Sequence, residues 1–182
     1  MSEKCKELFP HEDQVNLIKF FGDPRGSNGQ VSKKWYAENI VKWTPPYPLF
    51  YSDGKRTPLK TMLLHKKVVD VYTAAYTEVK EHFTPADIKE NHLDISGGTF
   101  NYRLMRGGSR LSVHAWGIAI DMDPARNPFP ATWREGMLNP DFANILEKHG
   151  LWWRGRKGDN DPMHFQAAWR RSEEHTSELQ SH

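Results

Sequence analysis

Apolar side chains between residues 65 and 83 recur at a spacing of three and four, which is the period of an α-helix with one buried face. The pattern predicts a long helix whose apolar stripe packs on a sheet. The positions on this stripe are Val68, Val71, Tyr72, Ala75, Val79 and Phe83.

A second helix is predicted over 139–150, where Phe142, Ile145 and Leu146 would face inward. Its ends carry clear signals, because Asn139 can cap the first turn, Pro140 suits the first helical position and Gly150 can end the helix.

The segment 12–21 predicts a third, short amphipathic helix. Val15, Ile18 and Phe21 fall on one side of it, and Gly22 can close it as a C-cap. We therefore expect these three apolar side chains to form its buried face.

Short segments with alternating or aromatic-rich patterns predict strands at 48–52, 99–105, 117–122, 151–155 and 163–167. The connections between them are short and rich in turn residues, and the strands do not alternate regularly with helices. This organisation predicts an α+β fold with a small antiparallel sheet and helices packed on one side.

The segment 112–121, SVHAWGIAID, places His114 and Asp121 seven residues apart. On one helix they would be separated by about 10.5 Å of rise, and on one straight strand by roughly 23 Å on opposite faces. They can converge only if the chain turns between them, and Gly117 can adopt the positive φ of such a turn. A carboxylate on so apolar a strand is costly unless it is paired or bound to a cation.

The segment 159–166, DNDPMHFQ, offers another histidine with an acid three residues earlier. His164 would lie beside the first pair if its strand neighbours 117–122, and Gln166 would share its face. Two imidazoles and one carboxylate suit one catalytic zinc ion with a fourth position left for water. We expect this zinc site to lie at the sheet. Asp161 could then take a proton from that water and pass it to a leaving amine.

The motifs SxHxxGxAxD and DxxHFQ resemble those of the zinc D-Ala-D-Ala carboxypeptidases and L-Ala-D-Glu endopeptidases, the VanY-type peptidases that include phage endolysins. The resemblance covers roughly 101–168 and implies a compact α+β fold around a small antiparallel sheet. Gln166 departs from the many relatives that carry glutamate or histidine there. The resemblance implies zinc ligands at His114, Asp121 and His164, a general base at Asp161, and substrate contacts from Arg103 and Ser112.

The resemblance also implies a zinc metallopeptidase that hydrolyses an amide bond in the peptide stems of peptidoglycan, as an L-Ala-D-Glu endopeptidase of a phage or prophage endolysin. Two alternatives stay open: a bacterial D-Ala-D-Ala carboxypeptidase or dipeptidase, and a non-catalytic zinc-containing module that binds the cell wall. The presence of Asp161 argues against the non-catalytic module.

Length and composition fit one peptidase domain over 1–170, since 37% of the 182 residues are hydrophobic. The last segment, 171–182, has no aromatic residue and no hydrophobic period, and it resembles a translated sequencing adapter. We expect it to be an artefact and disordered. The only cysteine, Cys5, can form no internal disulfide.

The formal net charge of +2 is too small to identify an anionic polymer, and no basic helix or stacking motif indicates a nucleic-acid partner. No apolar run is long enough to span a membrane, and the N-terminus lacks the apolar core of a signal peptide. We expect a monomer that is made in the cytoplasm without a signal peptide, does not insert into membranes and acts on the bacterial cell wall.

Overall fold

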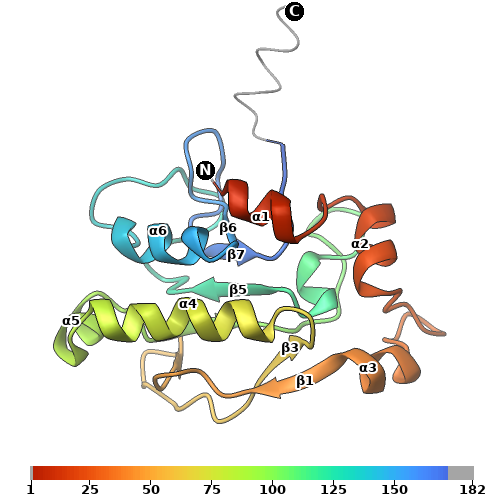
Figure 1. Cartoon of the computed structure of the whole chain (residues 1–182), viewed down its shortest axis with the longest axis horizontal. Coiled ribbons are helices and arrows are strands. Elements are labelled where there is room, and N and C mark those ends of the chain that lie inside the picture. Colours follow the sequence, from red (N-terminus) through yellow and green to blue (C-terminus); the bar gives the residue numbers. More distant parts are fainter. Residues whose placement is uncertain (1, 172–182) are drawn as a thin grey trace, which may run out of the picture.

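A computed structural model of the chain describes residues 2–171, and the fold over these residues is α+β, as predicted (Figure 1). Except for Arg171, the expected artefact lies outside the described residues. The helices are α1 (Glu3–Leu8), α2 (Gln14–Phe21), α3 (Lys33–Asn39), α4 (Val69–His82), α5 (Pro85–Glu90), the 3₁₀ helix η1 (Val113–Trp116) and α6 (Pro140–Lys148). The strands are β1 (Ile40–Trp43), β2 (Phe50–Tyr51), β3 (Met62–His65), β4 (Ile95–Gly98), β5 (Ala119–Met122), β6 (Trp152–Trp153) and β7 (His164–Gln166).

Five strands form the main sheet in the order β2-β4-β5-β7-β6. All neighbours pair antiparallel except β2 and β4, which are parallel. The predicted antiparallel sheet is therefore wrong at this edge, because the long connection through α4 and α5 returns the chain in the same direction. A separate antiparallel pair, β1 and β3, was not predicted as a second sheet.

The strand predicted at 99–105 is wrong, since the strand in this region is β4, which ends at Gly98. Gly98 has a φ of 114°, which ends the extended conformation. The backbone that follows turns toward the η1 loop, where the Asn101 amide donates to the carbonyl of His114 at 3.0 Å. Phe100, Tyr102 and Leu104 alternate with polar residues along the sequence, and this alternation imitated a strand pattern.

One face of the main sheet is covered by α4 and α6 (Figure 1). Tyr72 on α4 donates its hydroxyl to the carbonyl of Ile118 at 2.9 Å. The ring of Phe142 on α6 lies 5.8 Å from that of Phe165 on β7 and 5.9 Å from that of Tyr76 on α4. The predicted layering therefore holds for these two helices, whereas α2 lies beside η1 at one end of the sheet.

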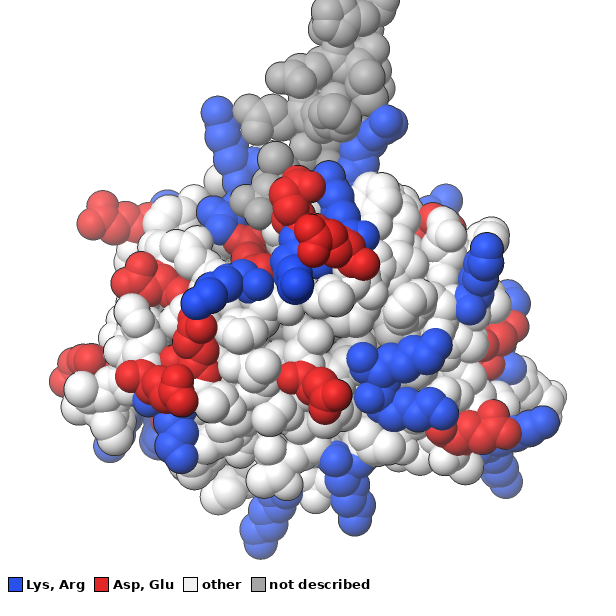
Figure 2. Space-filling model, viewed as in Figure 1, with Lys and Arg blue, Asp and Glu red and all other residues white. Residues whose placement is uncertain are grey.

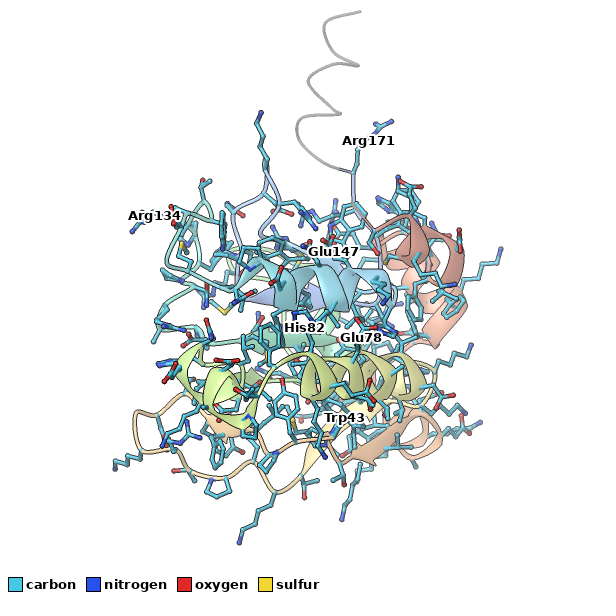
Figure 3. The ribbon with its side chains drawn as sticks, turned by 60° about the vertical axis from the view of Figure 1, so that its left-hand side comes forward. Trp43, Glu78, His82, Arg134, Glu147 and Arg171 are labelled. Carbon is cyan, nitrogen blue, oxygen red and sulfur yellow. The ribbon has the colours of Figure 1, made fainter. Side chains whose placement is uncertain are left out.

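The helix α4 also contacts β1 and α6 along its flanks (Figure 3). Trp43 on β1 donates its indole N–H to the hydroxyl of Thr73 at 3.0 Å. On the other flank, the Glu78 carboxylate accepts from Lys148 at 2.7 Å and lies 3.3 Å from His149 Nε2. Lysine, arginine and acidic side chains are interspersed on the face that carries α4 and α6 (Figure 2).

The helix predicted over 12–21 is present as α2, and Gly22 closes it with a φ of 87°. Its predicted buried face is wrong in part, because Val15 is 76% exposed. The helix packs instead through Leu17 and Phe21, whose spacing of four aligns them on one stripe.

The helix α6 follows its predicted end signals. The Asn139 side chain accepts from the Asp141 amide at 2.8 Å, Pro140 is the first helical residue, and Gly150 has a φ of 110°. Within residues 2–171, no helix combines the length and the apolar character that a membrane crossing would require.

Candidate metal centre and active site

The strands β5 and β7 bring the two sequence motifs together. Asp121 is directly opposite His164 in the antiparallel register, so the two side chains project from the same face of the sheet. This is the face opposite to the one covered by α4 and α6, because Ile120 and Phe165 form the adjacent pair on the core side. The structure therefore confirms the prediction that the strand of His164 lies next to the strand in 117–122.

His114 reaches the same point from η1, which is closed by a tight turn. Gly117 has a φ of 71° and donates its amide to the carbonyl of His114 at 3.0 Å. A Cβ at this position would lie 2.8 Å from Ile40 Cδ1 and 3.0 Å from the amide nitrogen of His65. Glycine is therefore required by both the conformation and the packing, as the turn between the two motif residues predicts.

Hydrogen bonds fix which ring nitrogens of the two histidines face Asp121. The His114 Nδ1 lies 2.7 Å from the carbonyl oxygen of Thr99, to which it must donate. The His164 Nε2 lies 2.8 Å from the side-chain oxygen of Gln166. The other two nitrogens, His114 Nε2 and His164 Nδ1, therefore point at the Asp121 carboxylate.

These three groups fit a metal ion. Asp121 Oδ2 lies 3.2 Å from His114 Nε2, and Asp121 Oδ1 lies 3.1 Å from His164 Nδ1. Ligand atoms at about 2 Å from a tetrahedral zinc are separated by roughly 3.3 Å, close to these distances. Because His114 Nδ1 and His164 Nε2 donate to other partners, the lone pairs of His114 Nε2 and His164 Nδ1 point at the Asp121 carboxylate. A cation or added protons must lie between these lone pairs and the carboxylate oxygens. One ligand atom from each of the three residues lies within 4.8 Å of the others.

The electrostatics of this cluster favour a cation. Burial opposes ionisation of Asp121, but the charge of His114 and hydrogen bonds from both imidazoles outweigh it and lower the pKa of the carboxyl. Burial also opposes protonation of His164, yet the hydrogen bond and charge of Asp121 raise the pKa of its imidazole. In the protein without metal the carboxylate thus attracts protons onto the imidazole, and a metal cation would take their place.

Asp161 lies three residues before His164, at the entrance to β7. Its Oδ1 is buried and has no hydrogen-bond partner among residues 2–171, while its Oδ2 lies 3.5 Å from a guanidinium nitrogen of Arg154. Burial raises the pKa of Asp161, against the opposing charges of His164 and Arg154. A partly desolvated carboxylate with a free oxygen is suited to accept a proton near neutral pH.

Two cavities border the group formed by His114, Asp121 and His164. One, of about 260 Å³, is lined by Arg103, Ser112 and Asp161 together with the three cluster residues. The other, of about 330 Å³, lies on the side of β4 and the 99–101 loop and shares Arg103, His114 and Asp121 with the first. The predicted site residues therefore all line the first cavity, and Arg103, His114 and Asp121 also border the second.

Ser112 and Arg103 have structural partners as well. The Ser112 hydroxyl oxygen accepts from the His114 amide at 3.2 Å and so caps η1. The Arg103 side chain donates to the carbonyl of Leu104 at 3.3 Å. Their roles in substrate binding stay predictions.

Three kinds of site residue were missed by the sequence reasoning. Arg154 pairs with Asp159 and Asp161. In the sequence it only follows two tryptophans in a predicted strand, and nothing there indicates these two partners except the acids themselves. Thr99 takes part through its backbone, which leaves no signal in the sequence. Glu12 contacts Gln166 across a separation of 154 residues, which no local pattern could indicate.

A carboxylate and two imidazoles that converge beside a buried acid form a group that could hold one metal ion. Residues 106–167 match the model of a family described as D-alanyl-D-alanine carboxypeptidase, which confirms over this segment the family predicted from the two motifs. The match supports a zinc-dependent metallopeptidase. It includes the three cluster residues and Asp161 but not Arg103. No curated protein and no solved structure gives a significant match.

Proposed function

We propose that the protein is a zinc metallopeptidase that hydrolyses an amide bond in the peptide stems of peptidoglycan, as an L-Ala-D-Glu endopeptidase of a phage or prophage endolysin. The observation that carries the proposal is the convergence of His114, Asp121 and His164 beside the buried oxygen of Asp161, inside one groove. The protein would act on the cell wall as a monomer, with no nucleic-acid partner.

The shape of the groove supports cleavage within a peptide. An endopeptidase must hold residues of the substrate on both sides of the scissile bond, whereas a carboxypeptidase needs room for one terminal residue on the leaving side. Cavities lie on both sides of the cluster, and each is lined by Arg103, His114 and Asp121. A peptide stem that crosses the cluster would fill both.

His114 Nε2, Asp121 and His164 Nδ1 would hold the zinc ion. When bound, zinc supplies Lewis acidity, which polarises a scissile carbonyl and lowers the pKa of water toward 7. Asp161 would accept the proton of the attacking water at Oδ1, which has no hydrogen-bond partner within residues 2–171, and deliver it to the leaving amine. The raised pKa of Asp161 brings its affinity for a proton closer to what this exchange requires at neutral pH.

Positive side chains around the groove would position the substrate. Arg103 borders both cavities, so its guanidinium can hold a substrate carboxylate next to the cluster and make the attack effectively intramolecular. Arg106 and Arg110 line the first cavity and add positive charge there. Stem peptides carry free carboxylates, so this charge would favour their entry.

The alternative as a D-Ala-D-Ala carboxypeptidase rests on the description of the matching family and on the same arginines, which could bind a terminal carboxylate. The alternative as a non-catalytic zinc module is disfavoured by Asp161. A buried carboxylate oxygen without a hydrogen-bond partner is costly, and a module that only binds would have no use for it.

The test is release of new amines from purified peptidoglycan by the zinc-loaded chain, with mass spectrometry of the fragments. Asp161→Asn is the matched control, because it preserves the size of the side chain and the metal ligands but cannot accept the proton. We expect a loss of roughly 10²- to 10⁴-fold in rate for this variant. New termini after L-Ala support the endopeptidase, release of D-Ala supports the carboxypeptidase, and zinc binding without cleavage supports the module.

A further inference from the structure

The N-terminal segment, outside the region of the family match, reaches the metal centre through Glu12. The Glu12 amide donates to the carbonyl of Trp169 at 2.9 Å, and His11 forms a parallel bridge with the same residue. These contacts hold the segment between α1 and α2 against the chain that leaves β7. Glu12 is thereby placed beside Gln166, the last residue of β7.

The side-chain amide of Gln166 has only one orientation that satisfies its neighbours. Its nitrogen donates to Glu12 Oε2 at 2.9 Å and to the carbonyl of Ala168 at 2.9 Å. Both partners are acceptors, so the oxygen and nitrogen of the amide cannot be exchanged. The oxygen therefore faces His164 Nε2, at 2.8 Å.

This orientation decides which nitrogen of His164 is available to a metal. Because Gln166 presents an acceptor, Nε2 must carry a hydrogen, and the Nδ1 lone pair then points toward Asp121. Gln166 is 1% exposed, so bulk water does not compete for these hydrogen bonds. The chain of contacts runs from a carboxylate through an amide to an imidazole, an arrangement that orients a ligand and raises its basicity.

We propose that Glu12 is a positioning residue of the metal centre: it holds the amide nitrogen of Gln166, which fixes the glutamine oxygen on His164 Nε2 and commits His164 Nδ1 to the metal. The Ala168 carbonyl satisfies one amide hydrogen, and Glu12 satisfies the second. The inference rests on the zinc site of the proposed function. It concerns metal affinity, which can be measured independently of peptidase activity.

The experiment measures the zinc dissociation constant of the full chain by competition with a chelating dye. Gln166→Leu removes the acceptor from His164 Nε2, and we expect affinity to fall by about 10- to 100-fold. Glu12→Ala leaves the glutamine oxygen in place but removes one of the two acceptors that hold its amide nitrogen, so we expect a fall of about tenfold, at the lower end of this range. Glu12→Gln keeps an acceptor oxygen and should lie closer to the wild type than Glu12→Ala does.

Two controls separate this role from loss of a charge or of an ion pair. Glu7→Ala removes an exposed carboxylate from α1 whose ion-pair partner is Lys4, and it should leave zinc affinity unchanged. Arg170→Gln removes the cation that lies 3.6 Å from Glu12 and spares the contact with Gln166. It should also leave zinc affinity unchanged.

The visible spectrum of the cobalt-substituted protein reports ligand geometry directly. We expect Gln166→Leu and Glu12→Ala to change its bands and the two controls to reproduce the wild type, while thermal unfolding of the metal-free proteins shows that all are folded. Glu12→Ala with wild-type zinc affinity and an unchanged cobalt spectrum would overturn the inference. Failure of the wild type to bind zinc or cobalt would overturn the metal site as well. Tight zinc binding that depends on Glu12, without cleavage of peptidoglycan, would support the inference and refute the peptidase.

Discussion

The two faces of the β5–β7 strand pair carry side chains with opposite physical requirements, although these residues are neighbours along each strand. On the core face, Ile120 and Phe165 are fully buried under α4 and α6. On the other face, Asp121 and His164 are joined by His114 in a polar cluster at the base of a groove. Apolar side chains on the core face need only volume and contact, whereas each polar atom on the site face needs a specific partner.

This difference shows how one strand pair can combine stability with chemistry. The core face gains from burial of apolar area, and it makes the register of β5 against β7 costly to shift, because a slip of one residue would expose its side chains. On the site face, the same register places Asp121 Oδ1 at 3.1 Å from His164 Nδ1. Substitutions on the two faces should therefore separate stability from metal binding.

The largest effect is expected for Asp121→Asn, which removes a proposed metal ligand but keeps the shape of the side chain. Zinc affinity should fall by more than the roughly 100-fold that changes outside the ligand set cost. In the metal-free protein the amide nitrogen can donate to one imidazole, whereas the charge interactions of the carboxylate are lost, so the unfolding free energy should fall by less than the roughly 3–5 kcal/mol expected for a large cavity in the core. Urea unfolding in a chelator checks the second claim, and a loss of several kcal/mol would contradict the separation of the two faces.

Phe165→Ala makes the opposite change on the core face. The ring stacks at 6.2 Å on Trp153 and meets Phe142 edge-on, so its removal should cost about 3–5 kcal/mol of unfolding free energy. The fraction that remains folded should bind zinc with nearly wild-type affinity. Denaturant unfolding measures the first effect and titration with zinc at low temperature the second; Phe165→Leu is the milder control.

His65 extends the comparison to a buried histidine outside the site. It donates from Nε2 to the carbonyl of Phe21 and accepts the Lys67 amide at Nδ1, so both nitrogens are satisfied only in the neutral ring. Burial, together with the charges of Lys67 and Lys66, outweighs the hydrogen bond to Phe21 and lowers its pKa from 6.5 to about 4. Its stabilising contribution should be complete above pH 6.5.

That contribution should be lost as the pH falls from 6.5 toward 4, because the unfolded state binds the proton first. The loss should reach about 2.5 kcal/mol at pH 4.5. Urea unfolding at pH 7 and pH 4.5 measures it, and His65→Gln is the control that lacks the titrating group. An equal pH dependence in both proteins would show that His65 contributes nothing to acid sensitivity.

Gly117→Ala tests the turn between η1 and β5, which carries His114 to the site face. The left-handed conformation and the contact with Ile40 should cost about 1–3 kcal/mol of unfolding free energy. Since the turn carries His114 to Asp121, zinc affinity should fall together with stability. A variant that loses stability but binds zinc like the wild type would show that η1 can adjust independently of the turn.

The smallest effect is expected at the surface, away from both faces. Lys148 is 67% exposed and pairs with Glu78 across α4 and α6, a contact that should contribute less than about 1 kcal/mol. Lys148→Ala should shift the thermal midpoint only slightly and leave zinc affinity unchanged. Salt should reduce even this shift, because exposed pairs are screened.

Much of the site was predictable because its chemistry lies in two short segments. The order and spacing of His114, Asp121, Asp161 and His164 identified the motifs, and the required turn at Gly117 followed from distances alone. The main helices were also predictable, since the apolar period of α4 and the end signals of α6 are local properties. Neither pattern indicates which other elements α4 and α6 pack against.

The sequence by itself determined the α+β class, the long helix, the turn and the residue types of a candidate metal site, because each depends on local spacing and side-chain chemistry. Only the tertiary structure decided that β2 pairs parallel with β4, that 99–105 is a loop, and that Leu17 and not Val15 is buried. It alone brought Glu12 to Gln166. Pairings between distant segments depend on how the whole chain packs, and no local pattern records them.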